Sequence, residues 1–245
     1  MLLNDVELVR TAQDRIAELR LPGGDLGATA AAELAAAATE LIEDRSIRVV
    51  VVVARGDDFC TGQAGDLDVF ALRPDPASAL ASLRPPVIAV LGGACRGVGL
   101  EIALAADLRI GAPDTVVALD HVRRGRVPAW GGSQRLPRAV RPGPAVGLAL
   151  LGRDVDADEA LRLGLLHDVA DDPTALADEL AATLITRGPL ALEFTKEAVH
   201  RGSELPLRDG LRLEGDLNHQ LAATEDRAEG LLAFFEKRPP DFGGR

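Results

Sequence analysis

Runs of apolar residues separated by short polar or glycine-rich segments dominate the first half of the chain. The segment Ile47–Ala54 contains five consecutive valines, and Val87–Leu91 is a second wholly apolar run. Continuous runs of this kind predict strands that are buried on both faces, as in a parallel sheet. Residues 5–21 instead alternate around Gln13-Asp14, and this alternation predicts a hairpin. Two further short strands are predicted over Leu108–Ile110 and Thr115–Leu119.

Helical spacing of apolar residues takes over at several points. The segment Thr29–Glu43 is rich in alanine and predicts a helix with Thr29 as its N-cap. Asp156-x-x-Glu159 resembles the capped start of another helix. After Gly131 no further strand is expected, and amphipathic helices are predicted over Thr174–Arg187, Pro189–His200, Leu207–Ala223 and Glu225–Arg238. The alternation of strands and helices predicts an α/β architecture built from repeated β-β-α units.

A glycine-rich turn joins the strand Val87–Leu91 to an apolar helix that is predicted to begin at Leu100. Four glycines lie in this turn, Gly92, Gly93, Gly97 and Gly99. Glu101 is the one charged residue in the first turn of the helix, where free N–H groups and the helix dipole favour negative charge. The residues alone leave two interpretations open. Glu101 is either a reactive carboxylate or a structural acid paired with an arginine.

Composition narrows the class of protein. The net charge of −11 over 245 residues argues against nucleic acid or an anionic membrane surface as a partner. No apolar stretch is long enough to span a bilayer, and no signal segment is evident at the start of the sequence. Two cysteines, Cys60 and Cys95, are too few for a disulfide framework or a zinc site. We therefore expect a cytoplasmic protein without a metal.

Three segments carry a resemblance to a known family. LGGACRGVGLEIALAADLRI, VPAWGGSQRLPRAV and GRDVDADEALRLGLLHDVA are similar to the crotonase superfamily, the enoyl-CoA hydratase/isomerase group, and the likeness extends over essentially the whole chain. The resemblance implies a crotonase (ClpP-like) spiral fold, with a core over residues 1–190 and a C-terminal helical trimerisation region over residues 191–245. It also implies a homotrimer or hexamer that acts on an acyl-CoA thioester and needs no separate cofactor, because coenzyme A is part of the substrate.

The same resemblance implies an oxyanion hole made of two backbone N–H groups. One donor is Val98. The other lies in the segment 59–67, FCTGQAGDL, where two additional residues stand between the glycine and the Asp-Leu pair. Aligning the segment from its start nominates Gln63, and aligning it from its end nominates Gly65. The alternative for this segment is an ordinary strand-to-helix loop. Further residues expected to contact substrate are Ala64, Asp66, Leu67 and Gly97.

Hydratases of this family hold the attacking water between two glutamates. Glu101 matches the first, which exchanges a proton with the carbon next to the thioester. The second position, which activates the water, is His121 here, preceded by Asp120. A histidine titrates near neutral pH and can both donate and accept protons. The pair Glu101 and His121 is therefore the predicted acid–base centre. The alternative is that His121 faces solvent or a loop carbonyl and that Glu101 works alone.

Other residues carry weaker predictions. Trp130 is expected either to line the acyl pocket or to be a core or interface aromatic, and Arg135 is expected to pair with a buried acid. Ala129 stands where some isomerases and dehalogenases of the family have an acid. Phe234 and Lys237 are expected either to contact coenzyme A or to be residues of an amphipathic helix. Arg123, Arg124 and Arg126 are expected to form either a phosphate or acyl site or a solvated face. His167, His200 and His219 are expected at the surface.

The favoured function is hydration or dehydration of an enoyl-CoA at its 2,3 double bond by Glu101 and His121. One alternative is an isomerase, or an enzyme that cleaves or decarboxylates a C–C bond, with the same oxyanion hole. The other is a non-catalytic subunit of a biosynthetic complex. The sequence leaves open the acyl group, the choice between these reactions, the pathway, and the choice between trimer and hexamer.

Overall fold

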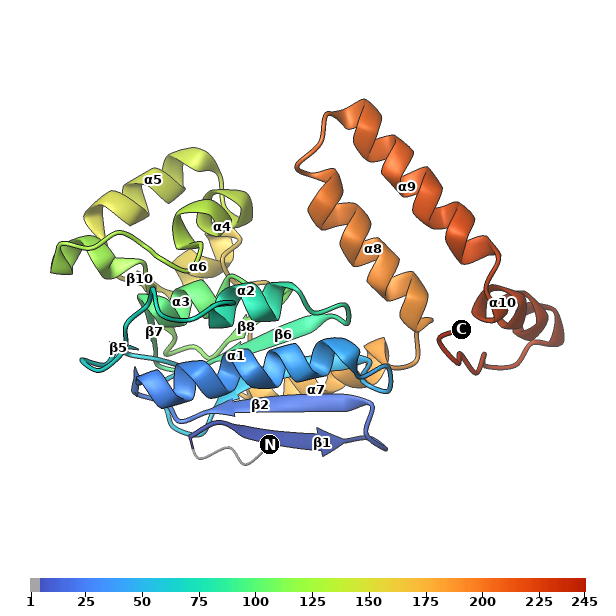
Figure 1. The fold of residues 1–245 in the computed structure, drawn as a ribbon, viewed down its shortest axis with the longest axis horizontal. Coiled ribbons are helices and arrows are strands. Elements are labelled where there is room, and N and C mark those ends of the chain that lie inside the picture. The colour runs from blue at the N-terminus through green and yellow to red at the C-terminus, as the bar shows by residue number, and fades with distance from the viewer. Residues whose placement is uncertain (1–4) are drawn as a thin grey trace.

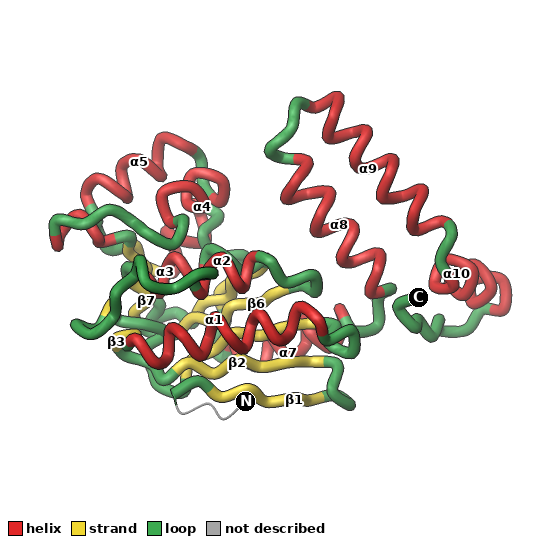
Figure 2. The backbone as a smooth tube through the Cα atoms, viewed as in Figure 1, coloured by secondary structure: helices red, strands yellow, loops and turns green. Residues whose placement is uncertain are grey.

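A six-stranded sheet forms the centre of the fold (Figures 1 and 2). The computed structural model describes residues 5–245. In spatial order the strands are β1 (Glu7–Thr11), β2 (Ile16–Leu21), β4 (Val49–Ala54), β6 (Val87–Leu91), β8 (Leu108–Gly111) and β11 (Asp168–Val169). The strands are parallel except for the β1–β2 hairpin. Two small sheets lie beside it: β10 (Val155–Asp156) with β9 (Val116–Ala118) and β7 (Ala94–Arg96), and β3 (Asp25–Leu26) with β5 (Gly62–Gln63).

Helices surround this sheet and then continue beyond it. Their bounds are α1 (Ala28–Glu43), α2 (Pro76–Ala81), α3 (Val98–Ala103), α4 (Gly132–Ala139), α5 (Pro142–Leu151), α6 (Ala157–Leu163), α7 (Pro173–Leu184), α8 (Pro189–Gly202), α9 (Leu207–Ala222) and α10 (Glu225–Glu236), with a 3₁₀ helix, η1, over Asp120–Arg124. None of the helices in residues 5–245 combines the length and the apolar character needed to cross a bilayer.

Both faces of the sheet are buried, which explains the continuous valine run. Successive residues of a strand point to opposite faces. Val49 and Val51 pack with α7, through Ala177 and Ala181, whereas Val50 and Val52 belong to the main core, which contains residues of α1, α2 and α3. A strand covered on both sides needs apolar residues at every position. The predicted strand and its parallel pairing are confirmed.

Most predicted elements are present, with three corrections. The hairpin turn lies at Ala12, Gln13 and Asp14, all with positive φ. Thr29 is not the cap of α1: the helix begins one residue earlier, after Gly27, and the Ala28 N–H donates to Asp66 Oδ2 at 3.3 Å. The helix after the glycine turn begins at Val98 rather than Leu100.

The expectation of no strand after Gly131 is wrong, because β10 and β11 each add two residues to a sheet edge. Asp156 does cap α6, and it accepts from the Glu159 N–H.

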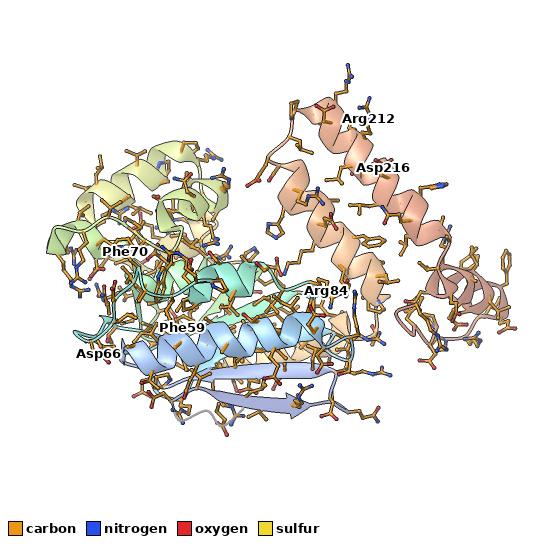
Figure 3. All side chains as sticks on the ribbon, viewed as in Figure 1. Phe59, Asp66, Phe70, Arg84, Arg212 and Asp216 are labelled. Atoms are coloured by element: carbon orange, nitrogen blue, oxygen red, sulfur yellow. The ribbon has the colours of Figure 1, made fainter. Side chains whose placement is uncertain are left out.

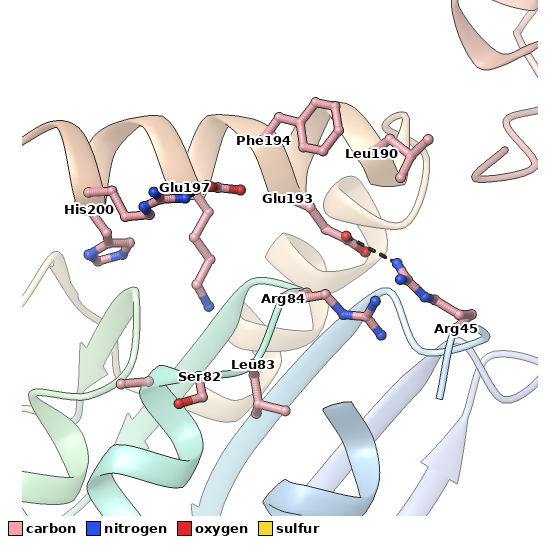
Figure 4. Close-up of a pocket in the computed structure, with 12 residues that line it drawn as sticks. Arg45, Ser82, Leu83, Arg84, Leu190, Glu193, Phe194, Glu197 and His200 are labelled. Carbon is pink, nitrogen blue, oxygen red and sulfur yellow. Dashed lines mark hydrogen bonds and ion pairs between the residues drawn. The ribbon is translucent and has the colours of Figure 1, made fainter. Parts of the chain in front are cut away.

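The last three helices extend away from the sheet. Helices α8 and α9 pack against each other, and α10 lies at the far end of the structure (Figure 1). Arg212 and Asp216 on α9 lie well away from the sheet (Figure 3). A cavity of about 530 Å³ lies between α8 and the end of α2, and Arg45 and Glu193 form an ion pair of 3.6 Å at its edge (Figure 4).

Asp107 attaches α8 to the sheet. Its carboxylate accepts from Lys196 Nζ at 2.7 Å, lies 2.8 Å from His200 Nε2, and accepts from the Val87 N–H at 2.8 Å. Burial alone would raise the pKa of Asp107, but the hydrogen bonds from His200, Lys196 and Val87 and the charge of Lys196 together hold it below its ordinary value. Three partners from two elements therefore depend on one ionised carboxylate.

We expect Asp107→Asn to lower the free energy of unfolding at pH 7 by about 1.5–3 kcal/mol, because hydrogen bonds to a charged acceptor are lost. A carboxyl with a lowered pKa stabilises the fold above its unfolded pKa, and that contribution disappears as the pH falls through the folded pKa. The difference from wild type should therefore shrink below about pH 4. Urea denaturation over pH 3–7 measures it, with Asp216→Asn on the exposed face of α9 as control. A difference that is constant over this range would contradict the role of the Asp107 charge.

Candidate active site

The glycine-rich turn allows α3 to approach the neighbouring segment closely. Gly97 has a φ of +53°, a conformation that favours glycine. A Cβ at Gly99 would lie only 2.5 Å from the Cβ of Cys60. Cys60 is paired by a β-bridge with Cys95 in β7. These contacts place the start of α3 directly beside the segment that was predicted to hold the first oxyanion donor.

Glu101 is fully buried in α3, and its two carboxylate oxygens have different surroundings. Oε1 accepts hydrogen bonds from the backbone N–H of Trp130 at 2.7 Å and of Gly132 at 2.8 Å. Oε2 lies 3.1 Å from Nε2 of His121. The partners of Glu101 are thus backbone groups and an imidazole, not an arginine. The interpretation of Glu101 as an acid paired with arginine is therefore wrong.

His121 comes from η1 and is 7% exposed. Its Nε2 is close enough to Glu101 for an ion pair, yet neither atom meets the alignment of a hydrogen bond, and Nδ1 also has no hydrogen-bond partner. The 3.1 Å separation still brings the two groups into direct contact, and a small rotation of the imidazole ring would complete the hydrogen-bond geometry. The alternative in which His121 faces solvent does not hold.

Unpartnered buried polar atoms concentrate at this point. Within residues 5–245, six buried side-chain nitrogen or oxygen atoms have no hydrogen-bond partner, and four of them belong to Glu101, Asp120 and His121. Buried polar groups in native proteins are almost always satisfied by protein, water or ligand. The cluster therefore marks a site that a polar molecule completes.

The two predicted oxyanion segments are the start of α3 and the segment 59–67, which contact each other through Gly99 and Cys60. Val98 is the first residue of α3, so its N–H has no acceptor within the helix. In the other segment the Ala64 N–H donates to the Leu26 carbonyl oxygen, which occupies that donor. The N–H of its neighbour Gln63 points to the other edge of β5. Gln63 and Gly65 both remain candidates for the first donor.

The structure places the other predicted substrate residues as follows. Leu67 and Trp130 are core residues, 4% and 1% exposed, and the Trp130 indole N–H donates to the Val69 carbonyl oxygen. The core alternative for Trp130 is confirmed. Asp66 is directed at the start of α1. Phe234 is 76% exposed, and it lies with Lys237 at the α10 end of the molecule, opposite α3 (Figure 1). Within one chain they do not join Glu101 and His121.

Arg135 acts on the backbone rather than on an acid. Its Nη1 donates to the Trp130 carbonyl oxygen at 2.5 Å, and burial lowers the pKa of its guanidinium. The direct partner of Arg135 is therefore a carbonyl oxygen rather than the predicted acid, and Asp75 and Glu101 act on it only through their charges, which partly offset the effect of burial on its pKa. Gly131 beside it has a φ of +91°, and a Cβ there would lie 2.5 Å from Nη1. Arg135 thus holds the turn whose N–H groups bind Glu101.

The arginines near the site contact other parts of the chain. Arg123 lies 3.4 Å from Asp154, Arg124 lies 3.7 Å from Asp120, and Arg126 donates to the side-chain oxygen of Gln63. The histidines predicted at the surface are exposed; they are His167, His200 and His219.

The thiol of Cys60 does not fit a nucleophilic role. Burial raises the pKa of Cys60 to about 11, and burial also raises the pKa of Cys95. Both thiols therefore stay protonated at neutral pH. Within residues 5–245, no group of three histidine, cysteine, aspartate or glutamate side chains is placed to hold a metal ion.

Comparison with known proteins identifies the class to which this fold and site belong. The sequence model of the family described as enoyl-CoA hydratase/isomerase matches residues 24–245. The chain is 37% identical over 227 residues to a probable enoyl-CoA hydratase of Mycobacterium bovis, with 87% of each chain covered. It is 36% identical over 223 residues to the 2,3-dehydroadipyl-CoA hydratase of Escherichia coli, with 87% of this chain and 86% of that one covered.

Solved structures agree with the sequence matches. The crystal structure of an enoyl-CoA hydratase from Bacillus anthracis superposes with a TM-score of 0.90 at 30% identity, over 99% of this chain and all of that one. The chain belongs to the enoyl-CoA hydratase/isomerase family and has the crotonase fold.

Gly132→Ala tests the binding of Glu101 by the turn. A Cβ at Gly132 would lie 2.9 Å from Cγ of Glu101 and 2.9 Å from Cδ1 of Leu119, so the carboxylate must move. We expect a loss of about 1–3 kcal/mol in the free energy of unfolding and loss of most enzymatic turnover. Gly143→Ala in α5, where nothing lies within 4 Å, is the matched control. Full activity of the Gly132 variant would show that the position of Glu101 is not constrained as described.

Proposed function

We propose that this protein is an enoyl-CoA hydratase-like lyase, which adds water to, or removes it from, the 2,3 double bond of an acyl-CoA thioester. The observation that carries this proposal is the buried contact of 3.1 Å between Glu101 Oε2 and His121 Nε2. Family membership supports the acyl-CoA thioester as substrate. The names of two relatives, a 2,3-dehydroadipyl-CoA hydratase and an (E)-benzylidenesuccinyl-CoA hydratase, support hydration as the reaction.

In the hydration direction the water oxygen bonds to C3 of the enoyl group, and one water proton moves to His121 Nε2. The π electrons move toward the thioester, and the resulting enolate oxygen accepts hydrogen bonds from Val98 and from Gln63 or Gly65. A proton on Glu101 Oε2 then bonds to C2, and the carbonyl is restored. Return of the proton from His121 to Glu101 across 3.1 Å resets the site.

The two oxygens of Glu101 have separate tasks in this scheme. Oε1 is occupied by two backbone donors, which fix the direction of the carboxylate. Oε2 is the oxygen that carries the proton. A rigid first oxygen keeps the second within reach of both C2 and the imidazole, which is the kind of positioning that catalysis requires.

Further parts of the proposal concern binding and assembly. Ala64, Asp66 and Gly97 lie along the path of the substrate, and Leu67 and Trp130 support the acyl pocket from the core. Phe234 and Lys237 contact coenzyme A only if α10 of another subunit reaches the site, which agrees with a homotrimer or hexamer. No cofactor is needed beyond the coenzyme A of the substrate, and the protein works in the cytoplasm.

Isomerisation of the double bond is the second candidate, because Glu101 alone is held by strong hydrogen bonds while His121 is not. Moving a double bond requires one base that shuttles a proton, whereas hydration requires a water that contacts both groups. The two reactions therefore depend differently on His121.

Glu101→Gln should lower kcat for trans-2-enoyl-CoA by about 10²–10⁴-fold, because the proton at C2 loses its carrier. His121→Ala should abolish hydration and spare isomerisation of a 3-enoyl-CoA. The absorbance of the conjugated enoyl thioester follows both reactions, with His219→Ala as the surface control. Wild-type protein that leaves short- and medium-chain enoyl-CoA unchanged would rule out simple hydration. The non-catalytic alternative would gain support if the protein also co-purified with a stable partner.

A further inference from the structure

The loop between η1 and α4 contacts both halves of the candidate site through Trp130. The backbone N–H of Trp130 donates to Oε1 of Glu101 at 2.7 Å. Its indole N–H donates to the carbonyl oxygen of Val69 at 2.9 Å, just beyond the segment 59–67 that contains the candidate oxyanion donors. The loop therefore connects the proposed proton carrier to the oxyanion segment, although the two are far apart in the sequence.

Arg126 makes a second connection between this loop and the oxyanion segment. Its Nη1 donates to the side-chain oxygen of Gln63 at 2.5 Å, over a separation of 63 residues. Its backbone N–H donates to the carbonyl oxygen of His121 at 3.0 Å. A hydrogen bond from a guanidinium cation is stronger than one between neutral groups. One arginine thus contacts both the residue proposed to activate water and a candidate oxyanion residue.

The amide of Gln63 in turn closes the loop that holds the candidate donors. Its Nε2 donates to the Leu67 carbonyl oxygen at 2.5 Å, across the three residues 64–66. Gly65 is exposed, and a Cβ there would meet nothing within 4 Å, so packing does little to fix this loop. Because arginine has no acceptor, the amide oxygen must face Arg126, which leaves the NH₂ group to bind Leu67. Arg126 therefore sets the direction of the bond that closes the loop.

The exact position of this loop matters for the proposed chemistry. An oxyanion donor is effective only at hydrogen-bond distance from the oxygen on which charge develops, and a misplacement of about 1 Å can cost about 10²-fold in rate. The Ala64 N–H is bound to the Leu26 carbonyl oxygen, which fixes one edge of β5. The contacts of the Gln63 side chain are the remaining constraint that aligns Gln63 or Gly65 with Val98.

We propose that Arg126 is a positioning residue for the oxyanion hole. Through the amide of Gln63 it holds the loop 63–67 in place relative to His121 and Glu101. The proposal rests on the proposed acyl-CoA function of the same site. Arg126 acts through Gln63 and not on the substrate itself. Its loss should therefore weaken stabilisation of the enolate more than binding of the ground state, which lowers kcat more than it raises KM.

Ionisation of a bound 3-ketoacyl thioester tests the oxyanion hole without turnover. Acetoacetyl-CoA forms an enolate whose ultraviolet absorbance differs from that of the keto form, and hydrogen bonds to its oxygen favour the enolate. The pH at which half of the bound ligand is enolate is measured by absorbance. Wild type should lower this midpoint relative to free ligand, and Arg126→Gln and Gln63→Ala should each raise it by about one pH unit, a tenfold effect.

Two further measurements separate positioning from a structural role. In Arg126→Gln, kcat for trans-2-enoyl-CoA should fall about tenfold, while KM changes less than about threefold. Arg126→Lys keeps a charged donor without the planar fork and should restore part of the midpoint shift. The double variant of Arg126→Gln and Gln63→Ala should match the single variants, because both remove the same connection. Arg138→Gln, on the exposed face of α4, is the control and should keep the wild-type midpoint.

Several results would overturn the proposal. One is a wild-type midpoint in Arg126→Gln, and another is additive shifts in the double variant. Gln63→Ala keeps the charge of Arg126, so an unchanged midpoint in this variant alone would reduce the effect to charge and contradict the role of the amide. A wild-type protein that leaves the midpoint of bound acetoacetyl-CoA at the value of free ligand would overturn the oxyanion function itself, and the proposal with it.

Discussion

Two backbone N–H groups at the start of α4 hold one oxygen of Glu101, and the arrangement of the site depends on this contact. The donors, Trp130 and Gly132, lie about thirty residues after the glutamate, so they join α3 to the start of α4. Arg135 fixes the same turn from behind through the Trp130 carbonyl oxygen. Because the carboxylate is fully buried, no solvent competes for these donors, and its orientation is set by the fold.

A single fixed oxygen leaves the other available for chemistry. Oε2 of Glu101 faces His121, and the neighbouring buried residue Asp120 has one carboxylate oxygen without a hydrogen-bond partner. A site with several unpartnered polar atoms in a row costs stability unless a ligand or water satisfies them. Burial of the valine-rich sheet on both faces offsets this cost in stability. The unpartnered atoms of Glu101, Asp120 and His121 are then available to bind a polar molecule.

Local patterns account for the parts of the fold that sequence predicted well. The five-valine run requires burial on two faces, and the glycine-rich turn requires a close approach that Gly99 makes to Cys60. Elements that depend on residues far away in the sequence were harder to predict. The first N–H of α1, at Ala28, donates to Asp66, which lies 38 residues away, and β10 and β11 are too short to give a period of their own.

The candidate site shows the same contrast between residues that a sequence pattern reveals and contacts that only the fold brings together. Glu101 and His121 were found from the resemblance, because their spacing is a family pattern. The backbone donors of Trp130 and Gly132 carry no side-chain signal. The partner of Arg135 is a backbone carbonyl oxygen, which leaves no mark in the sequence either, and the sequence therefore suggested an acid instead. Asp120 was visible only as the residue before His121. Its orphaned oxygen depends on which way the side chain turns in η1, and no periodic pattern encodes that direction.

Incorporation of labelled oxygen tests most directly whether Glu101 and His121 add water across the double bond. Wild-type protein is incubated with trans-2-enoyl-CoA in H₂¹⁸O, and the product is examined by mass spectrometry. The product formed by wild type should contain one ¹⁸O atom at C3, and Glu101→Gln or His121→Ala should give none above background. Exchange of the C2 proton with solvent without any ¹⁸O incorporation by wild type would contradict hydration and leave a proton-shuttling isomerase.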